Sequence, residues 1–101
     1  MYSITLHFTK CGEMIYISHL DLMRLFVRAM RRARIPLKLT EGFSPHPKFS
    51  ISHALKLGVE SMHEEATVVL TAPVPPQEFI ERLQLQLPKG IAITDVKGNF
   101  N

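Results

Sequence analysis

Residues 18–34 read SHLDLMRLFVRAMRRAR, and this stretch specifies the element around which the rest of the fold is arranged. Ser18 is a favoured N-cap residue, and Asp21 stands at the capping-box position three residues later. An apolar stripe at helical spacing follows; its members are Leu22, Phe26, Ala29 and Ala33, widened by Met23 and Met30. Pro36 cannot continue a helix. The sequence therefore predicts an amphipathic helix over residues 18–34.

Strands are predicted on both sides of this helix. Residues 2–9 alternate between apolar and polar side chains, as is typical of a half-buried strand. Residues 66–71 are β-branched through their middle, which also favours a strand. By the same criteria we predict strands at residues 14–17, 37–40 and 91–96, an extended stretch at 48–55, loops at 42–47 and 56–63, a second helix at 76–87 and a frayed tail at 97–101.

This order of elements predicts an α+β domain with the split βαβ arrangement, also called a ferredoxin-like sandwich. In it an antiparallel sheet carries two helices on one face, and here an extended insertion follows the second strand. We expect Phe26 and Leu83 to be buried between the helices and the sheet. The opposite face is left open, and polar strand residues such as Thr5 and His7 suit it. We assign residues 1–101 to this single domain.

The length of 101 residues and the composition exclude several classes of protein. One domain of this size leaves no room for a multi-domain enzyme. The sequence has one cysteine, Cys11, so neither an internal disulfide nor a cysteine metal cluster can form. No apolar run approaches the roughly eighteen residues of a membrane span, and residues 1–5 do not read as a signal peptide. We therefore expect a cytoplasmic protein that does not contact a membrane.

The charge is distributed unevenly along the chain. The formal net charge is +3, but residues 1–48 hold eight lysines and arginines against three acidic residues, whereas residues 49–101 hold four against six. A basic first half indicates an anionic partner, and nucleic acid is the first candidate.

Five of the arginines lie within the predicted helix or at its end. Arg24, Arg28 and Arg31 form a stripe, flanked by Arg32 and Arg34. Arginines one turn apart can bind successive phosphates, because the guanidinium fork matches phosphate oxygens. The alternative is a solvated helix face that keeps the domain soluble.

Residues 41–48, EGFSPHPK, form the second candidate feature. Each proline restricts the residue before it, so Ser44 and His46 are held out of helical conformation. The stiff loop would present His46 and Lys48 to an anion or a base. The alternative is a connecting loop whose prolines only limit the entropy of the unfolded chain.

The five histidines show no spacing typical of a helical metal site, and we predict neither a metal nor a cofactor. His19 and His46 are the candidates for general acid–base catalysis. No phosphate-binding glycine loop and no nucleophile motif is present in the sequence.

We expect the start of the helix and the loop to converge into one pocket for a phosphate or a carboxylate. Ser18, His19, Asp21 and Glu41 would form its rim, and Ser44, His46 and Lys48 would supply donors from the loop. His19 and His46 should then lie within about 10 Å of each other.

Four strings in the sequence are distinctive: ISHLDLMR at 17–24, RAMRRA at 28–33, EGFSPHPK at 41–48 and LGVES at 57–61. Over residues 2–98 the chain resembles a bacterial family of uncharacterised proteins linked to radical S-adenosylmethionine (radical SAM) enzymes. Members occur alone or as a C-terminal extension of a radical SAM protein. They are typically longer, which implies that this chain is a first module, a fragment or a short variant. The resemblance implies a radical SAM protein as partner, but this chain lacks the cysteine cluster of such an enzyme.

Three functions are consistent with these features. The first is a non-catalytic RNA-binding or substrate-presenting module that works beside a radical SAM enzyme. The second is a metal-independent enzyme that processes or modifies RNA with His19 or His46. The third is a protein-interaction module that docks on the radical SAM partner.

Overall fold

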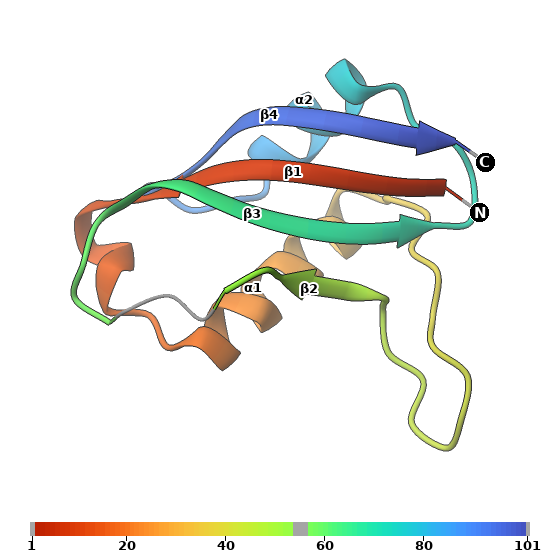
Figure 1. Cartoon of the computed structure of the whole chain (residues 1–101), viewed down its shortest axis with the longest axis horizontal. Coiled ribbons are helices and arrows are strands. Elements are labelled where there is room, and N and C mark those ends of the chain that lie inside the picture. Colours follow the sequence, from red (N-terminus) through yellow and green to blue (C-terminus); the bar gives the residue numbers. More distant parts are fainter. Residues whose placement is uncertain (1, 54–56, 101) are drawn as a thin grey trace.

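A computed structural model of the chain describes residues 2–53 and 57–100 and contains four strands, a 3-10 helix and two α-helices (Figure 1). In chain order they are β1 (Tyr2–Lys10), η1 (Gly12–Tyr16), α1 (His19–Arg32), β2 (Phe49–Ile51), β3 (Ser61–Leu70), α2 (Pro76–Gln84) and β4 (Ile91–Phe100). None of the described helices is both long enough and apolar enough to cross a bilayer.

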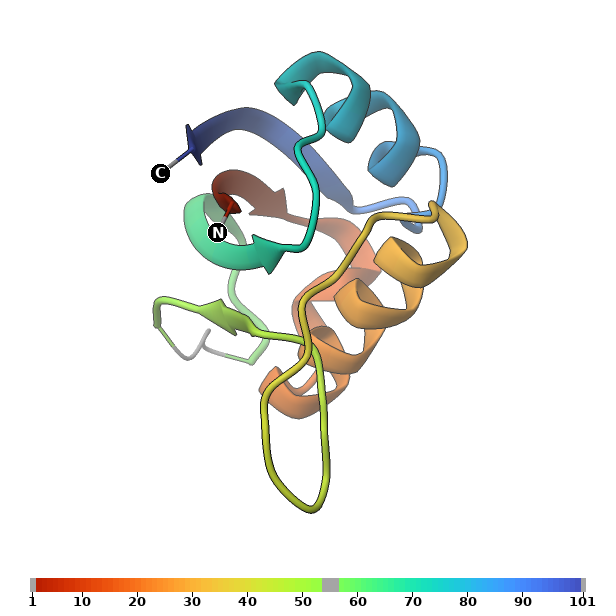
Figure 2. The same cartoon turned by 90° about the vertical axis from the view of Figure 1, so that its right-hand side faces the viewer.

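The strands form one sheet in the order β2-β3-β1-β4, and every neighbouring pair is antiparallel. Both helices pack on the same side of this sheet, as the two perpendicular views show (Figures 1 and 2). The prediction of a mixed α+β fold with a four-stranded antiparallel sheet and two helices is therefore confirmed.

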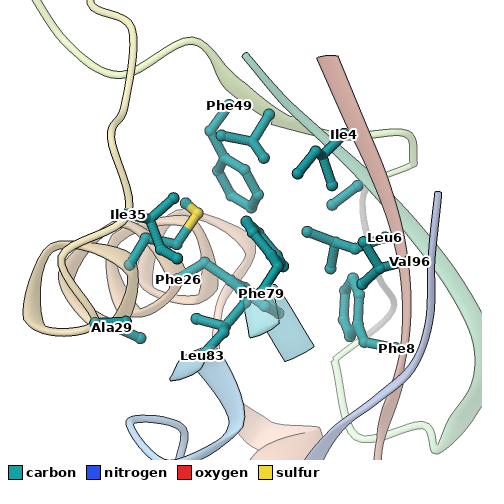
Figure 3. Packing of buried hydrophobic residues seen from close by; sticks show 14 of the residues in the cluster. Ile4, Leu6, Phe8, Phe26, Ala29, Ile35, Phe49, Phe79, Leu83 and Val96 are labelled. Carbon is teal, nitrogen blue, oxygen red and sulfur yellow. The ribbon is translucent and has the colours of Figure 1, made fainter. Parts of the chain in front are cut away.

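The core lies between the sheet and the helices (Figure 3). The alternation in β1 sends Ile4, Leu6 and Phe8 into it, each with no exposed surface. The ring of Phe26 from α1 meets the ring of Phe8 edge-on, with 4.8 Å between the centroids. Such edge-to-face pairs add to the stabilisation from burial. Leu83 of α2 is buried as well, so Phe26 and Leu83 both lie in the core as predicted.

Two of the predicted strands are wrong. Residues 14–17 lie largely in η1, because the chain turns tightly at Gly12, with φ 61°, and does not return as a hairpin. Residues 37–40 form no strand; only the isolated bridges Leu37 to Leu70 and Leu39 to Pro47 occur there. Proline lacks the N–H that a regular ladder requires, so Leu39 and Pro47 form a single bridge and no strand.

The second strand of the sheet is instead Phe49–Ile51, within the predicted extended stretch at residues 48–55. Residues 54 and 55 of that stretch lie outside the described residues. The predicted extended insertion therefore contains the second strand and does not follow it. A projecting loop of residues 40–46 precedes this strand and is seen in yellow-green in Figure 2.

The boundaries of three other elements differ from the predictions. β3 begins at Ser61, within a predicted loop, because Ser61 pairs with Lys10 of β1. The predicted frayed tail belongs to β4 as far as Phe100, which pairs with Tyr2. α2 ends at Gln84, three residues early, where the Gln84 side chain bonds the backbone of Ile91 and Ile93.

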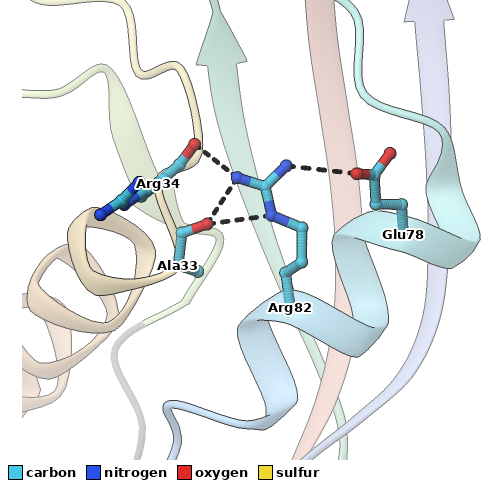
Figure 4. Close-up of polar contacts among 4 residues, drawn as sticks. All are labelled: Ala33, Arg34, Glu78 and Arg82. Atoms are coloured by element: carbon cyan, nitrogen blue, oxygen red, sulfur yellow. Dashed lines mark hydrogen bonds and ion pairs between the residues drawn. The ribbon is translucent and has the colours of Figure 1, made fainter.

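The C-terminal end of α1 is held by Arg82 of α2 (Figure 4). The Arg82 guanidinium donates to the carbonyl oxygen of Ala33 at 2.6 and 3.0 Å and to that of Arg34 at 2.6 Å. It also lies 3.5 Å from Glu78. A cation at this end of a helix satisfies carbonyls that have no partner within the helix. Arg82 therefore fixes the position of α1, on which the candidate site is built.

Candidate nucleic-acid interface

The arginines of α1 point away from the core because the opposite side of the helix is buried. Leu22, Phe26, Ala29 and Met30 face the sheet, which leaves Arg24, Arg28, Arg31 and Arg32 exposed. The ion pair between Arg24 and Asp21 spans 3.6 Å, and both side chains are 63% exposed. A pair so exposed holds its partners weakly, so the arginines are available to an external anion.

A groove of about 440 Å³ lies between α1 and the segment that follows the projecting loop; we call it the loop groove. Arg24, Arg28 and Arg31 line it from the helix, and His46 lines it from the loop. Its other lining is largely apolar and includes Leu20, Met23, Val27, Pro47 and Phe49. The loop groove therefore combines a cationic rim with an apolar floor.

A second groove, of about 660 Å³, lies on the other flank of α1, against residues 85–88 after α2; we call it the turn groove. Arg32 and Asp21 line this groove, together with Arg24 and Arg28. Because Arg24 and Arg28 line both grooves, they form a cationic ridge between them. We call these two residues the arginine ridge.

The projecting loop is closed at its base by hydrogen bonds between Thr40 and His46. The Thr40 N–H donates to the His46 carbonyl oxygen at 2.8 Å, and the His46 N–H donates to Thr40 Oγ1 at 3.2 Å. His46 Nδ1 lies 3.0 Å from the Ser44 carbonyl oxygen, which can only accept. In the tautomer that carries a hydrogen on Nδ1, this contact is a hydrogen bond and Nε2 is left as an acceptor.

The structure brings together some of the predicted site residues. Arg24, Arg28, Arg31 and His46 share the loop groove, whereas Arg32 and Asp21 line the turn groove. Lys48 lines neither; with Thr40 and His46 it lines a shallower depression of about 310 Å³ against Thr67 and Val69 of β3.

The remaining predicted residues lie at the ends of these features. Ser18 Oγ accepts from the Asp21 N–H at 3.1 Å, which confirms the predicted N-cap. His19 is half-buried, and Glu41 and Ser44 are exposed on the loop. None of these four residues lines either groove described above. The pocket that would join His19 to the loop stays a prediction.

Sequence reasoning missed the apolar floor of the loop groove and the whole turn groove. Met23 was assigned to the core stripe, but it is only partly buried and lines the loop groove. Met23 and Val27 are four residues apart, so they lie together on one flank of the core stripe. This spacing is the signal in the sequence for a second apolar surface.

The open face of the sheet carries charges of both signs, because it holds Lys97 as well as two carboxylates beside His7. The predicted open-face residue His7 lies 3.3 Å from Glu65 on β3 and 3.8 Å from Asp95 on β4. The flanking carboxylates disfavour a phosphate group close to His7. The cluster of exposed arginines lies on the side of the helices.

Comparison with known proteins gives a family and no activity. A family model described as "Uncharacterized protein conserved in bacteria (DUF2344)" matches residues 3–99. No curated protein matches the chain. Among residues 2–53 and 57–100, no group of three or more His, Cys, Asp or Glu side chains could hold a metal ion.

Proposed function

The chain belongs to DUF2344, a bacterial family of uncharacterised proteins, and we propose that this domain is a non-catalytic module that binds RNA or presents it to a partner enzyme. The arginine ridge carries the proposal. Two exposed guanidinium groups one helical turn apart separate a more polar groove from a largely apolar one. A nucleic acid strand has the same two components, since its phosphates are charged and its bases are flat and weakly polar.

Two further parts of the proposal have separate support. The strand order β2-β3-β1-β4 supports a ferredoxin-like assignment, which by itself implies no function. The resemblance of the strings at residues 17–24 and 41–48 supports a radical SAM enzyme as the partner. The single cysteine favours a reducing compartment such as the cytoplasm.

The proposal predicts that arginines on α1 matter more for RNA binding than other positive charges. Arg28→Gln and Lys97→Gln each remove one charge, but Lys97 is exposed on β4 beside Thr5 of the open face. We expect Arg28→Gln to weaken binding by about 1 kcal/mol, roughly fivefold in Kd, and Lys97→Gln to leave it nearly unchanged. Fluorescence anisotropy with a labelled RNA oligomer measures both constants.

Equal effects of the two substitutions would mean that RNA binding depends on the net charge of the domain and not on the position of the arginine ridge. Cleavage of the oligomer in the presence of a chelator would instead favour the enzyme that uses His19 or His46. Binding to a radical SAM protein without any affinity for RNA would favour the docking module.

A further inference from the structure

We propose that Phe43 is a stacking platform for an unpaired base, so that the RNA bound at the arginine ridge is single-stranded. This inference rests on the proposed function and names the class of RNA. It also gives a role to the apolar tip of the projecting loop, which the arginines leave unexplained.

Phe43 is the most exposed large apolar residue among those described, with a relative exposure of 109%. It stands beside Gly42, whose φ of 123° is strained for residues with a side chain. Phe43 therefore exposes its complete aromatic ring to water. A ring held there has both faces free, which is what stacking on a nucleobase requires.

The backbone of the loop that carries Phe43 is restricted before any ligand binds. Hydrogen bonds between Thr40 and His46 close the base of the loop, and the predicted restriction by Pro45 and Pro47 acts within it. Pro47 is buried and anchors the return of the chain to the body of the domain. A ring on a closed loop loses less conformational entropy on binding than one on a free chain.

Phe43 is also close in the chain to a residue that lines the loop groove. Phe43 precedes His46 by three residues, so their Cα atoms are at most about 11 Å apart. His46 itself lines the loop groove together with Arg24, Arg28 and Arg31. One strand can therefore place phosphates on the arginines and a neighbouring base on Phe43.

Duplex RNA does not fit this arrangement. In a helix the bases are stacked on one another, and only the terminal pairs offer a free face. A duplex would contact the arginines through its phosphates without using Phe43. Stacking on Phe43 would thus distinguish single-stranded from duplex RNA, which the positive charge of the arginines cannot do.

Tryptophan fluorescence tests the stacking directly, because the chain contains no tryptophan. We expect single-stranded RNA to quench the emission of Phe43→Trp by more than half, since base stacking brings the indole against a nucleobase. An abasic oligomer of the same length should bind without this quenching. Met62→Trp is the control, because Met62 is 61% exposed and lies near the start of β3, away from the end that pairs with Leu37.

Affinity gives a second measure that does not depend on a reporter. Phe43→Ala should raise the Kd for single-stranded RNA about tenfold and leave the Kd for duplex RNA unchanged. Phe43→Leu should behave like Phe43→Ala, because leucine keeps the bulk but has no π face. An unchanged urea midpoint would show that either variant is still folded.

The outcomes distinguish this inference from the proposed function. If Arg28→Gln weakens RNA binding but Phe43→Ala does not, stacking is overturned and the proposed function stands. If neither the wild type nor any variant binds RNA, both are overturned. If Phe43→Ala disrupts binding to a protein partner and not to RNA, the loop tip is a protein-docking element and stacking is overturned.

Discussion

Arg82 and the arginines of α1 have the same side chain, but the structure gives them different roles. The guanidinium of Arg82 donates to backbone carbonyls at the end of α1 and is held there at 32% side-chain exposure. The Arg24 side chain is 63% exposed and lies near one carboxylate. The first is therefore a structural residue and the second is available for a ligand.

This difference predicts opposite effects of the same substitution on stability. Arg82→Met should lower the free energy of unfolding by about 1–2 kcal/mol, because the carbonyls of Ala33 and Arg34 lose a charged donor. Arg24→Met should change it by less than about 0.5 kcal/mol, because exposed ion pairs contribute little. Urea unfolding followed by circular dichroism measures both. Equal losses would mean that Arg82 does not hold the helix end.

At the scale of elements, the turn before β4 packs against the turn after β1. The Cys11 N–H donates to the Gly90 carbonyl oxygen at 2.9 Å, which joins the start of η1 to the start of β4. A Cβ atom at Gly90 would lie 2.6 Å from the carbonyl oxygen of Cys11, at a φ of 104°. Only glycine fits there without displacing η1.

Gly90→Ala should therefore destabilise the domain by more than about 2 kcal/mol, through both strain and collision. Gly12→Ala is the matched control: its φ is 61°, but nothing lies within 4 Å of the added atom. It should cost only the left-handed backbone strain, about 1 kcal/mol. Thermal unfolding ranks the two, and a larger loss at Gly12 would contradict the contact with η1.

How much could be read from the sequence differs between elements for physical reasons. Periodicity located α1 and the buried side of β1, because packing on one face leaves a regular trace in the sequence. It did not locate η1, whose residues 14–17 are apolar without a period that separates a short strand from a turn. The boundaries of β4 depended on pairing with β1, which no local pattern contains.

The candidate site divides in the same way. The arginine stripe and the stiff loop were visible in the sequence because each is a local run. Their meeting in the loop groove was not, since it depends on how the segment at residues 46–49 returns beside α1. Arg82 was missed for the same reason, because its partners Ala33 and Arg34 lie 49 and 48 residues away in the chain.

At the scale of the whole molecule, the two sides of the sheet carry different charges. The helix side presents the arginines of α1, whereas the open side presents Glu65 and Asp95 beside His7 together with Lys97. We therefore expect an RNA strand to bind on the side of the arginines. Its affinity should depend on salt through the few phosphates that this side neutralises.

The number of phosphates that the arginines neutralise can be measured from the salt dependence of RNA binding. For single-stranded RNA, the logarithm of the association constant should fall linearly with the logarithm of the salt concentration. Replacing Arg24, Arg28 and Arg31 together with Gln should reduce the slope by about 2, since each phosphate contact on a single strand contributes about 0.7. Titrations at four or more salt concentrations measure the slope. An unchanged slope would mean that the three side chains only solvate the helix.

The place of β1 in the sheet also has a consequence for how the protein is made. β1 is synthesised well before its partners, since Tyr2 pairs with Leu70 and with Phe100. At about 5–20 residues per second, the ribosome needs roughly 3–20 s to supply those partners. During that time the segment that carries Ile4, Leu6 and Phe8 has no neighbouring strand to pair with. The nascent chain, and not the finished domain, is thus the form most in need of a chaperone.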